Sequence, residues 1–180
     1  VGTPIYTDYL NGELLSDDET ADIYDEARAY LAEKGFYRYE VSNFAKKGFE
    51  SRHNLNYWRR GEYIGCGVAA SSFVDGRRFT NTFSIDEYMN AIIYNKTPEI
   101  SSDIIEGEDA EFEFIMLGLR TEEGISVKKF NETFNADFDN KYASALKKKE
   151  RFLLRDGDRL KIKDEYLYVQ NDIILEFMKG

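Results

Sequence analysis

Residues 16–42 read SDDETADIYDEARAYLAEKGFYRYEVS and set the fold class of the first half of the chain. Ser16 and Glu19 have the spacing of a capping box, in which each side chain accepts a hydrogen bond from the other residue's backbone N–H at a helix start. We expect the helix to end near Gly35, because glycine suits the left-handed conformation that closes a helix. Residues 36–42 then alternate in polarity, which is typical of a half-buried strand whose inward face carries Tyr37, Tyr39 and Val41. A helix followed closely by a strand predicts an α/β unit.

The rest of the chain divides into segments with different patterns. Spacing and turn residues predict an extended lead-in at 2–6, a loop with a short helical turn at 43–61, a small-residue strand at 63–70, a hairpin with an Asp-Gly turn at 73–79, helices at 85–95, 106–119, 127–134 and 138–149, a second hairpin at 152–162, and a closing helix near 167–177. We therefore predict an α+β fold: α/β elements in residues 1–96, then a mostly helical, winged-helix-like domain in residues 97–180.

Composition limits the class of protein. The 180 residues carry a net charge of −10, with 42% hydrophobic and 32% charged residues, and the apolar runs are too short to span a bilayer. The acidic balance argues against a nucleic-acid partner. The basic stretch at residues 147–163 could form the DNA-contacting surface of a winged helix, but a solvated face balanced by nearby carboxylates is the simpler interpretation. We see no signal peptide and expect a cytoplasmic protein. It could still contact an acceptor protein at the membrane surface.

Cys66 is the only cysteine in the chain. One thiol excludes an internal disulfide framework and any metal site that needs several cysteines of this chain. Cys66 could be a reactive thiol or an axial ligand, but we expect a buried structural cysteine between Gly65 and Gly67, because free cysteine is among the most buried residue types. The two glycines would let a flat group or another backbone approach closely, although a tight strand inside a sheet would also explain them. A third glycine at dinucleotide-binding spacing is missing, so that interpretation is weak.

The only histidine, His53, lies five residues before the only tryptophan, Trp58. Imidazole binds metals and carries protons near neutral pH, and indole offers a large flat face with one donor. With Asn54 and Tyr57 they could form a contact surface for a planar, partly polar ligand. A turn whose polar tips bond to the backbone would explain the same residues.

Three runs of residues resemble a known family. They are YEVSNFA at 39–45, SRHNLNYW at 51–58 and YIGCG at 63–67, supported by GTPIY at 2–6, RRFTN at 77–81 and EFIMLGLR at 113–120. Together they resemble the radical SAM proteins related to oxygen-independent coproporphyrinogen III oxidase, and most of all the heme chaperone branch. The His-Asn-x-x-Tyr-Trp pattern is a signature of that branch.

The resemblance implies how the parent protein is built. Its N-terminal partial (β/α) barrel would hold a 4Fe–4S cluster on a CxxxCxxC loop and bind S-adenosylmethionine. That loop is missing here, and the chain begins at Val1 without methionine, so we expect a C-terminal piece that completes the barrel and adds the helical domain. Alone it should bind no cofactor and should not cleave S-adenosylmethionine. The family commonly has a histidine where this chain has Ser71, which leaves His53 alone.

The resemblance also implies candidate functions. The parent would bind and deliver heme, with His53 as a candidate iron ligand and Tyr57 and Trp58 packing on the macrocycle. Alternatively it would be an oxidase that decarboxylates coproporphyrinogen III, with Arg77 and Arg78 holding propionates. In such oxidases the segment aligned with residues 54–58 contacts a second S-adenosylmethionine, which makes Asn54 and Asn56 candidate contacts. A third possibility is that the C-terminal unit is an interaction module for an acceptor or redox partner.

Overall fold

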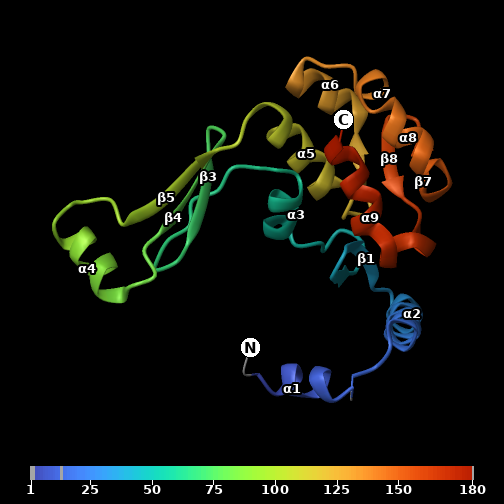
Figure 1. Cartoon of the computed structure of the whole chain (residues 1–180), viewed down its shortest axis with the longest axis horizontal. Helices are drawn as coiled ribbons and strands as arrows, with labels where there is room; N and C mark the ends of the chain where they lie inside the picture. The colour runs from blue at the N-terminus through green and yellow to red at the C-terminus, as the bar shows by residue number, and fades with distance from the viewer. Residues whose placement is uncertain (1–2, 13, 180) are drawn as a thin grey trace. The chain divides into compact units, whose positions relative to one another are not determined.

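The structure is a computed structural model that describes residues 3–12 and 14–179 (Figure 1). The chain forms two compact units, divided between Glu50 and Ser51. Helices and strands are mixed in both units, which confirms the α+β class. None of the helices in the described ranges has the length and apolar character needed to cross a membrane.

The first unit begins with helix α1 (Pro4–Asn11), where the sequence predicted extended chain. That prediction is wrong from Pro4 onward, whereas Thr3 has an extended backbone and Gly2 lies outside the described residues. The Thr3 side chain accepts a hydrogen bond from the backbone N–H of Tyr6, and Pro4 fits the first helical turn because no N–H is needed there. Gly12 then ends the helix with φ 69°.

Helix α2 (Asp17–Glu33) confirms the capping box of Ser16 and Glu19, with both reciprocal hydrogen bonds in place. Strand β1 (Tyr37–Glu40) follows and pairs antiparallel with β2 (Asn43–Ala45), a strand that the sequence did not predict. The expected inward face of β1 is wrong, because Tyr37 is exposed whereas Arg38 and Glu40 are buried. The Glu40 carboxylate accepts hydrogen bonds from the turn to β2, which holds it inside.

The second unit starts with helix α3 and an arm, which we call the β-arm (residues 71–104). Its elements are α3 (Arg52–Trp58), β3 (Ser71–Val74), β4 (Arg77–Asn81), α4 (Ile85–Ile93) and β5 (Glu99–Ile104). The strands form an antiparallel sheet in the order β3-β4-β5. Asp75 and Gly76 both have positive φ, which confirms the predicted Asp-Gly turn. Strand β5 was not predicted.

The predicted strand at residues 63–70 is wrong. Only Tyr63 pairs, in an isolated bridge with Phe73, and residues 64–70 form a loop. Positive φ angles at Gly67 (108°) and Ala69 (59°) bend the backbone out of the extended conformation. We predict a domain boundary of the parent protein between residues 96 and 97 of this chain. Strand β5 follows this boundary and pairs with β4, which precedes it.

The helical domain (residues 105–179) packs helices around a small sheet. It contains α5 (Gly107–Gly118), β6 (Ile125–Ser126), α6 (Val127–Phe134), α7 (Phe138–Lys141), α8 (Ala143–Lys149), β7 (Leu153–Asp156), β8 (Arg159–Ile162) and α9 (Gln170–Ile174), with 3₁₀ turns at Glu150–Phe152, Asp164–Val169 and Leu175–Lys179. The predicted hairpin is β7–β8, and β6 adds a third strand in the order β6-β8-β7. The single helix predicted at residues 138–149 is interrupted at Tyr142.

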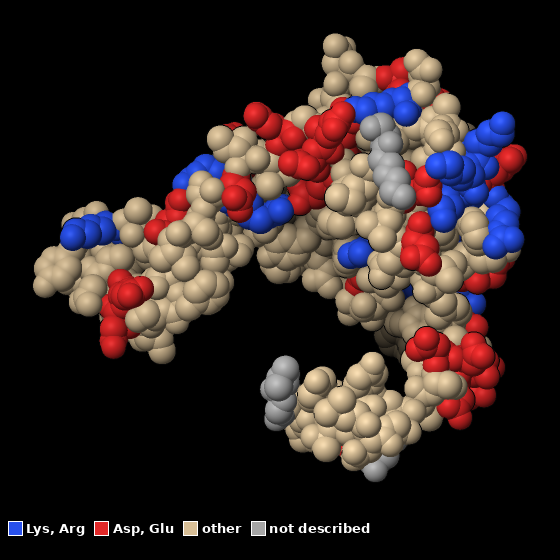
Figure 2. All heavy atoms as spheres, in the orientation of Figure 1, with Lys and Arg blue, Asp and Glu red and all other residues tan. Residues whose placement is uncertain are grey.

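The core of the helical domain is almost entirely apolar. Its buried members come from every α-helix and strand of the domain, and the most deeply buried are Ile115, Leu119, Ile125, Phe130, Phe138, Ile173, Ile174 and Phe177. At the surface, cations and carboxylates alternate over much of this domain (Figure 2). Several residues of the basic stretch are paired, as Arg155 is with Asp139 and Lys148 is with Glu176.

Candidate functional site

Helix α3 places its functional side chains on two different sides. Ser51 caps the helix by accepting a hydrogen bond from the Asn54 backbone N–H at 3.2 Å. Residues four apart share a helix face, and His53 Nε2 accordingly lies 3.0 Å from the hydroxyl of Tyr57, with the rings edge to face at 4.7 Å. Trp58 is rotated by about 100° from Tyr57 around the axis. The helix therefore separates the two residues expected to pack on one ligand.

An aromatic row continues from α3 into the β-arm. The rings of Tyr57 and Tyr63 meet edge to face at 4.6 Å, and Tyr63 is 6.5 Å from Phe73. The backbones of Tyr63 and Phe73 exchange two hydrogen bonds of 2.9 Å, which fixes this end of the row. Exposure falls along it, from the exposed His53 to Phe73, which is 3% exposed. The row thus leads from the surface to a buried aromatic face.

Two arginines cover that buried face. The guanidinium carbons of Arg60 and Arg78 lie 4.8 and 5.1 Å from the centroid of the Phe73 ring. Glu113 of α5 joins them, because Arg60 Nε is 2.7 Å from one carboxylate oxygen and Arg78 Nη2 is 2.6 Å from the other. Burial lowers the pKa of Arg78, but the hydrogen bond and charge of Glu113 more than offset this, so the net shift is upward. Arg78 therefore stays charged.

These residues surround a cavity of about 320 Å³, which we call the tyrosine–arginine cavity. Its walls are Tyr57, Arg60, Gly61, Tyr63, Phe73, Arg78, Glu113 and Leu117. An aromatic face beside two fixed guanidinium groups can hold a planar ligand that carries a carboxylate, because arginine pairs with carboxylates through two parallel hydrogen bonds. The sequence predictions missed Arg60 and Glu113. The available signal was Glu113 itself, a charged residue between Phe112 and Phe114 in an apolar helical pattern.

The structure does not bring Arg77 to this cavity. Neighbouring residues of a strand point to opposite faces of the sheet, and Arg77 accordingly stacks over Phe79 at 4.7 Å and donates a hydrogen bond of 3.0 Å to Ser102. It also forms an ion pair with Glu99. In this arrangement Arg77 and Arg78 therefore cannot bind the same carboxylate.

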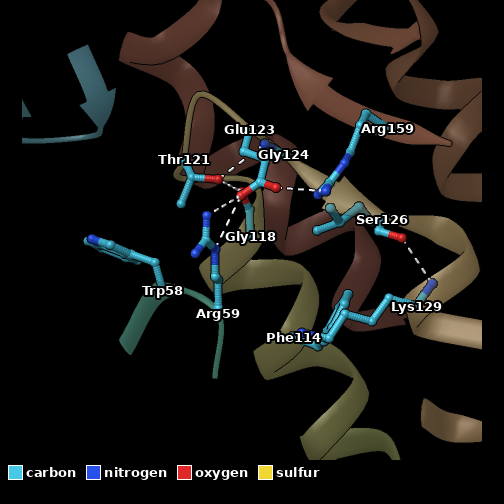
Figure 3. Close-up of a pocket in the computed structure, with 11 residues that line it drawn as sticks. Trp58, Arg59, Phe114, Gly118, Thr121, Glu123, Gly124, Ser126, Lys129 and Arg159 are labelled. Carbon is cyan, nitrogen blue, oxygen red and sulfur yellow. Dashed lines mark hydrogen bonds and ion pairs between the residues drawn. The ribbon is translucent and has the colours of Figure 1, made fainter. Parts of the chain in front are cut away.

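Three other predicted residues, Asn54, Asn56 and Trp58, do not line this cavity. The Asn56 side chain donates a hydrogen bond of 3.0 Å to the carbonyl of Glu62 and so ties the end of α3 to the following loop. Trp58 lines a separate, smaller cavity with Arg59 (Figure 3). Asn54 is partly buried at the start of α3.

The two glycines that flank Cys66, Gly65 and Gly67, have different roles. A Cβ on Gly65 would lie 2.2 Å from the carbonyl oxygen of Ser71, so this glycine permits a close approach of backbone to backbone. Gly67 faces open space but has φ 108°, and its N–H donates to the hydroxyl of Tyr88 at 3.2 Å. Cys66 between them is exposed, which corrects the expectation that it is buried, and it lies in a loop rather than in the predicted strand.

Metal binding has little support from side-chain clustering in the ranges that the structure describes. They contain no group of three or more His, Cys, Asp and Glu residues that could hold a metal ion. Ser71 shares a hydrogen bond of 2.9 Å with Thr80. His53 Nε2 is within hydrogen-bonding distance of Tyr57, so an iron bound at this nitrogen would have to displace that contact.

Comparisons with known proteins agree on one family. Residues 105–169 match the HemN C-terminal domain. The heme chaperone HemW of Lactococcus lactis subsp. lactis (strain IL1403) is 32% identical over 167 residues, covering 92% of this chain and 44% of that protein. HemW of Bacillus subtilis (strain 168) is 33% identical over 130 residues, covering 72% and 34%.

A mitochondrial relative and a solved structure extend the comparison. Radical S-adenosyl methionine domain-containing protein 1 of Bos taurus is 46% identical over 71 residues, covering 38% of this chain and 16% of that protein. Coproporphyrinogen III oxidase (HemN) from Escherichia coli, a radical SAM enzyme, shares the fold with a TM-score of 0.71 at 15% identity, over 92% of this chain and 42% of that one. The chain spans less than half the length of these relatives. The chain corresponds to a C-terminal segment of the HemW-like radical SAM proteins, and this segment includes a HemN C-terminal domain.

Proposed function

We propose that the full-length protein binds heme and delivers it to an acceptor, and that the tyrosine–arginine cavity contacts one edge of the macrocycle. The observation that carries this proposal is the aromatic row from His53 to Phe73, which ends under Arg60 and Arg78. Heme is a planar apolar ring with carboxylates along one edge, and this row offers the matching surface. HemW relatives in bacteria are heme chaperones by name.

The cavity's size defines how much of the ligand it would hold. Its 320 Å³ is near the lower end of small-molecule pockets, which run from about 300 to 1,000 Å³. We therefore assign it one pyrrole and its propionate rather than the whole ring. Arg78 would pair with that propionate while Glu113 holds both guanidinium groups in place.

His53 is the candidate axial ligand of this proposal. It is exposed at the open end of the aromatic row, and a neutral imidazole nitrogen is a good iron ligand. The hydroxyl of Tyr57 fixes the imidazole through the contact at Nε2. Removing that hydroxyl would leave the nitrogen open to iron.

The iron–sulfur cluster and S-adenosylmethionine do not belong to residues of this chain. A cluster needs several thiolates, and the sequence has only Cys66. We propose that the full-length protein holds both groups with residues outside this segment, and that it works in the cytoplasm. The domain boundary between residues 96 and 97 belongs to the same proposal.

Heme titration of the full-length protein tests the ligand assignment. His53→Ala should weaken binding and change the Soret band, whereas Tyr57→Phe should leave the band unchanged and keep or raise the affinity. Unchanged affinity and spectrum in His53→Ala would remove His53 as a ligand. Formation of protoporphyrinogen by the reconstituted protein would instead favour the oxidase alternative.

A further inference from the structure

A second cavity is lined by Trp58 at the end of α3 and shares no lining residue with the tyrosine–arginine cavity (Figure 3). Its volume is about 160 Å³, and α3, α5, α6, β6 and β8 all contribute to its walls. We call it the tryptophan cavity after Trp58, the only indole of the chain. Its charged lining residues are Arg59, Glu123, Lys129 and Arg159.

Glu123 holds the two arginines of this cavity in place. One of its oxygens accepts hydrogen bonds from Arg59 Nη2 at 2.9 Å and Nε at 3.3 Å, and the other lies 2.6 Å from Arg159 Nη2. Figure 3 shows both guanidinium groups turned toward this carboxylate. Each guanidinium has five N–H donors, so most of them remain available to a further acceptor.

Lys129 adds a third cation. Its Nζ lies 6.0 Å from the centroid of the Phe114 ring, and within the described part of the chain no carboxylate forms an ion pair with it. Its neighbour Lys128 is paired with Glu132 at 3.8 Å. The lining therefore carries three positive charges and one negative charge, a net charge of +2 on a chain whose total is −10.

The first turn of α6 contributes side chains to the cavity, because the backbone N–H groups of Lys128 and Lys129 already donate hydrogen bonds within the chain. The backbone N–H of Lys129 already donates to the Ser126 hydroxyl at 3.0 Å, and that of Lys128 donates to Asp158 at 2.7 Å. Asp158, which is not among the lining residues, also accepts a hydrogen bond from Ser126. Recognition in this cavity must therefore come from Arg59, Arg159 and Lys129.

We propose that the tryptophan cavity binds a phosphate group. A dianion matches the net charge of the lining, and a volume of about 160 Å³ suits a small oxyanion rather than a whole cofactor. Guanidinium groups recognise phosphate oxygens through paired hydrogen bonds, and Lys129 adds a point charge. The indole of Trp58 offers a flat face to a ring attached to the phosphate. This site is separate from the proposed heme contact, which is lined by different residues.

The single tryptophan makes the site directly observable. In a ¹H–¹⁵N spectrum of the 180-residue chain, Trp58 gives the only indole N–H resonance. Titration with inorganic phosphate at constant ionic strength should shift this resonance along a saturating curve. Lys129→Met should weaken binding about fivefold, the effect of losing roughly 1 kcal/mol from one partly exposed charge contact.

Lys128→Met is the matched control, because it makes the same charge change one residue away on α6. Its affinity for phosphate should stay within about twofold of the unmodified chain, a small effect typical of a solvent-exposed charge. A linear shift without saturation, or equal weakening in both variants, would overturn the proposal. A parallel titration with adenosine monophosphate separates the sources: tighter binding than phosphate indicates a phosphate carried on a planar ring, and equal binding indicates the free anion.

Discussion

The helical domain buries mostly apolar side chains, whereas the β-arm of the second unit buries mostly polar ones. Phe130, Phe138 and Phe177 of the helical domain are at most 1% exposed. In the β-arm, Phe73 at 3% is buried together with the polar residues Ser72 at 1%, Asn81 at 7% and Thr82 at 4%, whereas Phe83 is 71% exposed.

The two regions are therefore stabilised by different interactions. Hydrophobic burial stabilises the helical domain. Hydrogen bonds of the sheet stabilise the β-arm, and Glu113 attaches it to α5 through Arg78. The candidate heme contact lies where these two kinds of packing meet.

Substituting one phenylalanine in each region should give the largest difference. Phe130→Ala removes a fully buried ring and should lower the free energy of unfolding by about 3–5 kcal/mol. Phe83→Ala removes an exposed ring and should change it by less than about 0.5 kcal/mol. Urea unfolding followed by circular dichroism measures both. Equal losses would show that the β-arm has an apolar core that the structure lacks.

The two bridging glutamates give the next largest difference. Glu113→Gln leaves two partly buried arginines without their carboxylate and should lower the free energy of unfolding by about 2 kcal/mol. Glu123→Gln is the control, because Glu123 also joins two arginines but at an exposed position, where about 0–1 kcal/mol is expected. A larger loss in Glu123→Gln would contradict the role of Glu113 as the link between the regions.

A hydroxyl inside the helical domain should have a smaller effect. Tyr142 donates a hydrogen bond of 3.0 Å to Glu111, and burial together with this carboxylate raises the pKa of the tyrosine. Tyr142→Phe should lower the free energy of unfolding by about 1 kcal/mol. Tyr94→Phe, in the exposed part of the β-arm, should leave it unchanged. Thermal melts of the two variants at pH 7 would reveal a contradiction if their midpoints agreed.

Substitution of Asp158, which accepts hydrogen bonds at the start of α6, should give the smallest of these effects. This effect should depend strongly on pH. Hydrogen bonds from the Ser126 hydroxyl and the Lys128 N–H lower the pKa of Asp158. A lowered pKa in the folded state stabilises the fold above the ordinary pKa of about 3.9, and this contribution disappears as the pH falls through the folded-state pKa. Asp158→Asn should therefore reduce the melting temperature at pH 7 but not near pH 2. A difference in melting temperature that does not depend on pH would show that the charge of Asp158 is not its cause.

Local signals in the sequence predicted much of the fold. The capping box at Ser16 and the Asp75-Gly76 turn were predictable because each depends on residues within three positions of one another. Strand β5 was missed because its polar centre lacks alternation and becomes a strand only by pairing with β4. The opposite orientations of Arg77 and Arg78 followed from the predicted hairpin and could have been inferred from it.

The candidate site was less predictable than the fold. His53 and Tyr57 are four residues apart on one helix, so their contact follows from helical spacing. The contact of Arg60 with Glu113 joins residues 53 positions apart, and no local pattern specifies it. The separation of Tyr57 from Trp58 followed from the helix, but only the structure shows that each lines a different cavity.

The central claim is that the tyrosine–arginine cavity holds a heme propionate through Arg78. Heme titration of Arg78→Met and Arg77→Met in the full-length protein tests it most directly, because these adjacent arginines carry the same charge but only Arg78 lines the cavity. We predict that Arg78→Met weakens heme binding about tenfold, as expected for the loss of one charge-assisted hydrogen bond, and that Arg77→Met stays within about twofold. Circular dichroism should show both variants folded. Equal affinities in the two folded variants would contradict the claim.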